Sequence, residues 1–188
     1  HETISSIFSQ TFTDFEFLII NDGSTDSTTE LLADMTDPRI VVLHNDQNQG
    51  LPYSLNKGLA RAQGEYIARI DGGDLAAPER LEKQVSFLEY YPEVGIVGTG
   101  YSRIDENGQE LGIKRNPSGD LEIRWMSLLK NPFFHPTVML RKDILDRHNL
   151  TYDPTFHTSQ DYELWTRLLE HTQGANLDEL LVLYRKTD

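Results

Sequence analysis

Short apolar runs alternate with amphipathic segments through the first half of the chain. The runs are rich in β-branched and aromatic residues and are bounded by turn formers, so we predict strands at residues 15–21, 39–45, 65–70 and 94–104. Leucines repeat at helical spacing between them, which predicts helices around Leu31 and Leu32, over 51–62 and over 77–91. This alternation is typical of an α/β fold with a mostly parallel, doubly wound sheet that has helices on both faces.

The pattern becomes mixed in the second half. Asn107-Gly108 is a hairpin-turn signal, and residues 120–130 and 159–171 have the spacing of helices. Residues 177–186 end the chain as a strand or as a strand–helix edge. Because no stretch rich in glycine, serine and proline divides the chain, we expect one domain over residues 1–188, with halves at 1–104 and 105–188.

Composition places the chain among ordinary globular proteins. It has 188 residues, of which 38% are hydrophobic and 25% charged. It contains no cysteine, which excludes disulfides and thiolate metal sites. The sequence has neither an apolar run of about 20 residues nor a signal peptide, so we expect no membrane span. A cytoplasmic location fits, and peripheral attachment to the inner membrane face stays open.

The charge balance limits the partners. Thirty acidic and 17 basic residues give a net charge of −13, which argues against a nucleic-acid partner because phosphate backbones bind basic surfaces. An anionic small ligand would need a local arginine, a helix N-terminus or a metal ion.

Two predicted strands end in acidic residues. Asp22 follows the first strand and Asp71 follows the third, and ligands in such sheets bind beyond the carboxyl ends of the strands. Gly72 and Gly73 separate Asp71 from Asp74 and let the backbone approach a ligand. Carboxylates at this position suit Mg²⁺ or Mn²⁺ bridging phosphates. Equally, Asp74 could cap the following helix, and Asp71 could be an ordinary strand-end acid.

Structural interpretations stand beside the other candidates too. The stretch NDGSTD at 21–26 is typical of a turn before a helix. Thr158 and Asp161 have the spacing of a capping box, while a general base at a helix start is the alternative for Asp161. His135 is expected to be a satisfied core or loop histidine.

Several stretches in order resemble the bacterial family-two glycosyltransferases. They run along essentially the whole chain and are IINDGSTDST, QNQGLPYSLNKGLARAQGEYIARIDGGDLAAPERLEKQV, NPFFHPTVML, SQDYELWTRLLE and LLVLYR. The resemblance implies a GT-A fold and inverting transfer of a sugar from a nucleotide diphosphate donor, usually UDP-linked. It also implies a carbohydrate or lipid-linked acceptor in cell-surface polysaccharide synthesis.

The resemblance assigns roles by matching position. Asp22 would contact the uracil or ribose, and Asp71 would be the first acid of the Asp-x-Asp motif, on the ribose or near the metal. Asp161 falls on the catalytic base, which takes the proton of the acceptor hydroxyl. The divalent cation, Mn²⁺ or Mg²⁺, would be bound by Asp71 and Asp74.

The chain departs from the family pattern at three places. Gly73 stands where the metal-ligating aspartate is expected, which puts metal binding by Asp71 and Asp74 in doubt. Gln160 replaces the glutamate before Asp161 and removes a neighbouring negative charge. The first strand of the family should precede His1 and is absent. Gly73 also makes a catalytically impaired nucleotide-sugar-binding domain the alternative function. A nucleotidyltransferase or dinucleotide-binding enzyme is disfavoured, because the sequence lacks a Gly-x-Gly-x-x-Gly turn and a Walker lysine.

Overall fold

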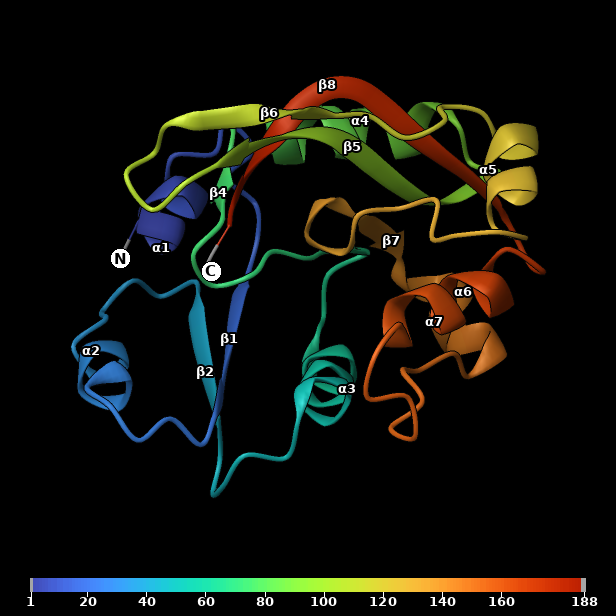
Figure 1. The fold of residues 1–188 in the computed structure, drawn as a ribbon. Helices are drawn as coiled ribbons and strands as arrows, with labels where there is room; N and C mark the ends of the chain where they lie inside the picture. The colour runs from blue at the N-terminus through green and yellow to red at the C-terminus, as the bar shows by residue number, and fades with distance from the viewer. Residues whose placement is uncertain (1, 187–188) are drawn as a thin grey trace.

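Two sheets organise the chain, where the sequence predicted one (Figure 1). The computed structural model describes residues 2–186. A small sheet pairs β1 (Phe17–Asp22) with β2 (Ile40–Asn45). The large sheet has the strand order β3 (Tyr66–Ala68), β7 (Met139–Arg141), β5 (Val94–Ile104), β8 (Gln173–Arg185) and β4 (Leu75–Ala76), and β6 (Glu110–Lys114) also pairs with β5.

The sheets are mixed in strand direction. β1 with β2 and β5 with β8 are parallel, whereas the pairs β3–β7, β4–β8, β5–β6 and β5–β7 are antiparallel. The α/β class is therefore confirmed, and the large sheet mixes parallel and antiparallel pairs. One cause is the predicted hairpin: Gly108 adopts φ +82° in the turn, and β6 folds back along β5.

The helices follow the amphipathic segments closely. The structure has α1 (Glu2–Phe8), α2 (Thr28–Ala33), α3 (Leu51–Arg61), α4 (Arg80–Tyr90), α5 (Asp120–Met126), α6 (Lys142–His148), α7 (Gln160–Leu168) and the short 3-10 helix η1 (His135–Thr137). In Figure 1, α6 and α7 lie together beneath one end of the large sheet. This arrangement brings the start of α7 near the loop that leads into η1.

The larger core cluster fixes α7. Leu164, Trp165 and Leu168 are fully buried, as the helical spacing predicted. They pack with residues of β5, β7 and α6 in one cluster. Burying each such side chain contributes about 1.5–3 kcal/mol, so α7 has little freedom to shift. The side chains of its first turn are held at the rim of the core.

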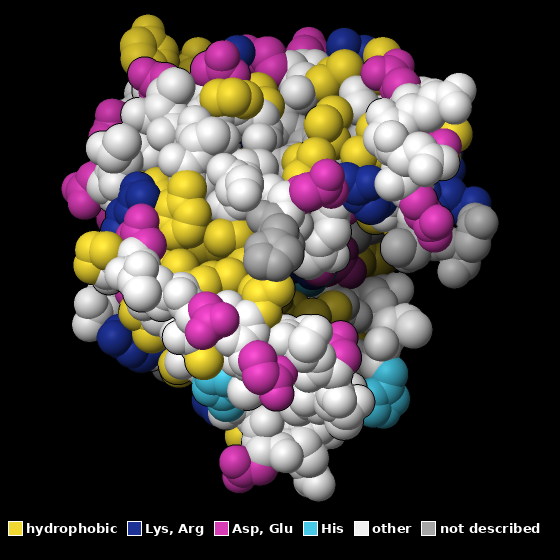
Figure 2. Space-filling view, turned by 90° about the vertical axis from the view of Figure 1, so that its left-hand side faces the viewer, with side chains coloured by type: hydrophobic (Ala, Val, Ile, Leu, Met, Phe, Trp, Pro, Cys, Tyr) yellow, Lys and Arg dark blue, Asp and Glu magenta, His cyan; other side chains and the backbone are white. Residues whose placement is uncertain are grey.

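A groove separates the two sheets. β1 and β3 belong to different sheets, and a hollow of about 660 Å³ opens between them. Apolar side chains of both strands and of α3 line it, among them Phe17, Ile20, Leu59 and Tyr66. Figure 2 shows the side of the molecule on which the small sheet lies. On this face acidic side chains are scattered, and Lys and Arg form small separate groups rather than a stripe.

Candidate active site

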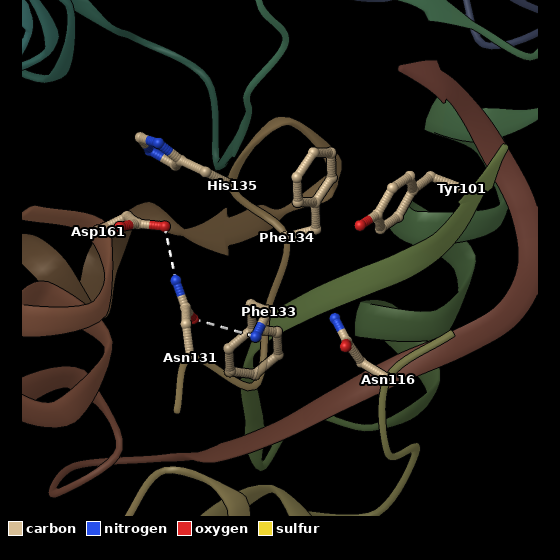
Figure 3. Close-up of a pocket in the computed structure, with 7 residues that line it drawn as sticks. All are labelled: Tyr101, Asn116, Asn131, Phe133, Phe134, His135 and Asp161. Atoms are coloured by element: carbon tan, nitrogen blue, oxygen red, sulfur yellow. Dashed lines mark hydrogen bonds between the residues drawn. The ribbon is translucent and has the colours of Figure 1, made fainter. Parts of the chain in front are cut away.

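A polar pocket forms where α7 meets the loop before η1. It has a volume of about 360 Å³. Its lining comes from β5, from the segment after β6, from the loop before η1, from η1 itself and from α7, through Tyr101, Asn116, Asn131, Phe133, Phe134, His135 and Asp161 (Figure 3). The sequence analysis had singled out two of these, Asp161 and His135.

Asp161 lies in the first turn of α7, where the positive end of the helix favours a carboxylate. The predicted capping box is wrong. The N-cap is Ser159, in a left-handed conformation with φ 60°, and it makes no side-chain cap bond. Instead, Asn131 donates from Nδ2 to Asp161 Oδ2 at 2.7 Å (Figure 3). A contact across 30 residues has thus replaced the local one.

His135 is a satisfied core histidine, as predicted. It is 8% exposed, and its Nε2 lies 2.9 Å from the hydroxyl oxygen of Tyr152. Burial, helped by the positive charge of Arg69, lowers the pKa of His135 to about 2. The imidazole is therefore neutral over the physiological range and does not act as a proton donor in its charged form.

The charges of Asp161 and Asp71 both act on the hydroxyl group of Tyr152. Burial raises the pKa of its hydroxyl, Arg69 opposes this rise, and Asp161 and Asp71 add to it. Through its contact with His135, Tyr152 lies directly behind the pocket that Asp161 lines.

Asp71 is bound by an arginine. Arg69 Nη1 donates to Asp71 Oδ2 at 2.8 Å, and Arg69 Nη2 donates to Oδ1. The Arg69 side chain is 9% exposed and that of Asp71 is 44% exposed. Arg69 Nε is buried without a hydrogen-bond partner. The pair therefore presents a carboxylate whose charge is balanced from the protein side.

Asp74 has a structural position. It is 2% exposed and precedes β4, and its Oδ1 accepts a hydrogen bond from the Arg185 backbone N–H at 3.0 Å. Burial raises its pKa to about 6. The cap interpretation is wrong, because α4 begins at Arg80 and Glu79 is its N-cap. Asp74 ties the β4 edge to the end of β8.

Asp71 and Asp74, which follow β3, are not arranged to bind a divalent cation. Arg69 occupies both oxygens of Asp71, Gly73 offers no side-chain ligand, and Asp74 is buried. In the described part of the chain, no cluster of three or more His, Cys, Asp or Glu side chains could hold a metal ion. Metal binding by Asp71 and Asp74 stays a prediction that this geometry does not support.

Asp22 shapes the loop after β2. Its Oδ1 accepts hydrogen bonds from Asn45 Nδ2 at 2.7 Å and from the Gln49 N–H at 2.9 Å, and its Oδ2 accepts one from the Gly50 N–H at 3.0 Å. Burial alone would raise the pKa of Asp22, but these hydrogen bonds outweigh it and lower the pKa. Across residues 2–186, Asp22 shares no hydrogen-bond partner with Asp71 or Asp161.

The predicted turn after β1 is present. The Ser24 N–H donates to Asn21 Oδ1 at 3.0 Å, and the Thr28 N–H donates to Asp26 Oδ1 at 3.0 Å. The turn leads into α2, whose N-cap is Ser27.

Sequence reasoning missed most of the polar groups around the acids. Asn131, Arg69 and Tyr152 carry the hydrogen bonds described above, and Tyr101 and Asn116 line the pocket. Asn131 stands in the NPFFHPTVML stretch and Arg69 in the IARIDGGD stretch, so motif position was a signal for both. Tyr152 stands in no such motif.

None of the helices in the described residues has the length and apolar character that crossing a membrane requires.

Known proteins resemble this chain in sequence. The family model for glycosyl transferase family 2 matches residues 1–148. An uncharacterised glycosyltransferase of Haemophilus influenzae is 34% identical over 98% of the chain. The amylovoran biosynthesis glycosyltransferase AmsE of Erwinia amylovora is 32% identical over 98%, and the O-antigen biosynthesis glycosyltransferase WbnJ of Escherichia coli is 34% identical over 97%. The chain spans 60%, 69% and 72% of these relatives, respectively.

Solved structures share the fold. TarS residues 1–349 of S. aureus, in complex with UDP-GlcNAc, superpose with a TM-score of 0.82 at 19% identity, over 100% of this chain and 54% of that one. The mannosyltransferase PcManGT of Pyrobaculum calidifontis, in complex with GDP-Man and Mn²⁺, gives 0.72 at 18% identity, over 97% of this chain and 51% of that one. These likenesses confirm the GT-A fold. The family model and the sequence relatives show that the chain belongs to glycosyl transferase family 2.

Proposed function

We propose that this chain transfers a sugar from a nucleotide diphosphate sugar to an acceptor hydroxyl with inversion at the anomeric carbon, with Asp161 as the base. One observation carries the proposal. Asp161 lines a 360 Å³ polar pocket with Oδ2 held by Asn131, and Oδ1 has no hydrogen-bond partner among the described residues. A carboxylate with one engaged and one available oxygen is suited to accept a proton.

The chemistry needs a single base. As the acceptor hydroxyl oxygen forms a bond to the anomeric carbon, Asp161 Oδ1 takes its proton. The bond from that carbon to the diphosphate oxygen breaks, and the nucleotide diphosphate leaves with the electron pair. Attack from the face opposite the leaving group inverts the centre, so no covalent enzyme intermediate is required.

The donor site in this proposal lies around Asp71 and Asp22. Asp71, oriented by its pair with Arg69, contacts the ribose. Asp22 contacts the base or the ribose. A UDP-linked donor is favoured by the TarS complex with UDP-GlcNAc. The GDP-Man complex of PcManGT makes a guanosine donor the alternative.

The product proposed is a cell-surface polysaccharide. Two relatives act in amylovoran and O-antigen biosynthesis, and the lining of the pocket by amides, a phenol and a carboxylate suits a hydroxyl-rich acceptor, carbohydrate or lipid-linked. The proposed location is the cytoplasm, including the inner face of the membrane.

Incubation of the protein with UDP-glucose, UDP-galactose, UDP-N-acetylglucosamine and GDP-mannose, each with a panel of aryl glycosides, tests the proposal. We expect release of nucleotide diphosphate and a glycosidic product whose anomeric configuration, read by NMR, is opposite to that of the donor. A product with retained configuration would contradict inversion.

The alternative is a nucleotide-sugar-binding domain that has lost catalysis. Gly73 favours it, since it removes a side chain at the donor strand end. Tight nucleotide binding without turnover for any donor and acceptor pair would support this alternative over the transferase.

A further inference from the structure

Asn131 makes two hydrogen bonds that fix its amide in one orientation. Its Nδ2 donates to Asp161 Oδ2 at 2.7 Å, and its Oδ1 accepts from the Phe133 N–H at 3.1 Å (Figure 3). A reversed amide would point oxygen at the carboxylate and N–H at N–H. Both contacts would then be repulsive, so the orientation shown is the only one that satisfies both partners.

The packing behind the two residues holds them at this separation. Phe133 is 3% exposed, and its ring lies edge-on to that of Trp165, with ring centroids 6.4 Å apart. Trp165 is fully buried on α7, one turn beyond Asp161. In addition, the Tyr162 hydroxyl donates to the Ser127 carbonyl oxygen, which ties α7 to the segment after α5. The loop and the helix are therefore packed against each other through buried side chains.

We propose that Asn131 is the positioning residue for the catalytic base. It holds Asp161 Oδ2 through a hydrogen bond of 2.7 Å and leaves Oδ1 to take the acceptor proton. The inference rests on the proposed role of Asp161. It assigns to Asn131 the choice of which oxygen reacts and the direction from which the acceptor hydroxyl must approach.

A structural role for Asn131 makes a different prediction, and one substitution separates the two. Asn131→Asp keeps an oxygen for the Phe133 N–H, so the loop retains its anchor. The same change replaces the Nδ2 donor with an oxygen that faces Asp161 and brings a second carboxylate beside the first. If Asn131 only anchors the loop, the variant keeps its activity. If Asn131 positions the base, the second carboxylate beside Asp161 lowers the activity.

The first measurement is the pH–rate profile of UDP release from UDP-N-acetylglucosamine, with water as the acceptor, for wild type, Asn131→Asp and Asn131→Ala. For Asn131→Asp we expect turnover to fall by about 100-fold and the acid limb of the profile to move up by about 1 pH unit, with KM changed less than about threefold. For Asn131→Ala we expect turnover to fall by about tenfold, since this change removes the hydrogen-bond donor without adding a charge. Asn107→Asp makes the same exchange in the exposed hairpin turn and should match wild type.

The second measurement does not depend on turnover. The ¹⁵N-labelled side-chain amide of Asn131 is followed by NMR through an acid titration. Its signal should move as Asp161 takes up a proton in wild type, and this movement should be absent in Asp161→Asn. It also serves if Asn131→Asp fails to fold.

The inference is overturned if Asn131→Asp has the turnover and profile of wild type, or if the amide signal titrates identically in wild type and Asp161→Asn. Parallel assay of Asp161→Asn keeps the two proposals apart. If that variant is inactive while Asn131→Asp is normal, only the role of Asn131 fails. If Asp161→Asn itself retains full turnover, the base assignment fails and the positioning role falls with it.

Discussion

Both terminal nitrogens of the Arg69 guanidinium group donate hydrogen bonds to the carboxylate of Asp71. One contact, from Nη1 to Oδ2, measures 2.8 Å, and the Arg69 side chain is only 9% exposed. The carboxylate that the family resemblance assigns to the donor and its metal is thus already paired inside the protein. A cation that bound Asp71 would have to displace a largely buried arginine.

We therefore expect nucleotide binding to be nearly independent of divalent cations. The affinity for UDP, measured by titration calorimetry, should change by less than about threefold between buffers with Mn²⁺ and with EDTA. The reason is that Arg69 bonds both oxygens of the Asp71 carboxylate, which leaves little room for a metal ion. GDP in the same two buffers is the control for nucleotide preference. Tightening of UDP binding by more than about tenfold with Mn²⁺ would show that Asp71 exchanges Arg69 for the metal.

Asp22→Ala should loosen the loop after β2. The variant removes an acceptor for the N–H groups of Gln49 and Gly50 and for Asn45, and hydrogen bonds to a charged group contribute about 1.5–3 kcal/mol each. Because water replaces part of them, we expect the free energy of unfolding, from urea titration, to fall by about 2–3 kcal/mol in total. UDP affinity should fall as well.

Asp26→Ala is the matched control for that measurement. Asp26 is exposed and accepts a hydrogen bond from the Thr28 N–H in the turn after β1. Asp26→Ala should therefore lower the free energy of unfolding clearly less than Asp22→Ala does. Equal losses for the two variants would argue against a special role for the Asp22 network.

His135 should make the protein less stable in acid. Its pKa is about 2 in the folded protein and about 6.5 when unfolded, because burial disfavours the charged ring. Between these values the unfolded chain binds more protons, so stability falls as pH drops below about 6.5, by about 1.4 kcal/mol per pH unit from this residue. His135→Gln keeps a polar contact for Tyr152 and does not titrate, so it should flatten the dependence.

Urea unfolding at pH 7, 6 and 5 checks this prediction, with His157→Gln, at an exposed histidine, as the control. Equal slopes for wild type and His135→Gln would show that another group dominates the acid sensitivity.

Hydrophobic periodicity was enough to predict most elements, because it reports burial within one strand or helix. The strand at residues 94–104 and the inward face of α7 show this. Strand pairing could not be predicted from the pattern, since it depends on distant segments, and β4 has two residues, too few for a pattern to reveal.

The partners of the acids escaped prediction for the same reason. Asp161 and Asp74 both stand at positions where a local cap is a reasonable expectation. Each binds a residue far along the chain instead, Asn131 at a separation of 30 positions and Arg185 at 111. Local motifs identify which residues carry charge, whereas the tertiary structure decides which group each charge meets.

Turnover of Asp161→Asn tests the central claim most directly. The change keeps the size of the side chain and removes its ability to take a proton, so we expect the rate of UDP release from UDP-N-acetylglucosamine to fall by about 10²–10⁴-fold, with UDP affinity unchanged. Asp143→Asn, at an exposed surface ion pair with Arg147, should retain full activity. Wild-type turnover in Asp161→Asn would contradict the assignment of Asp161 as the base.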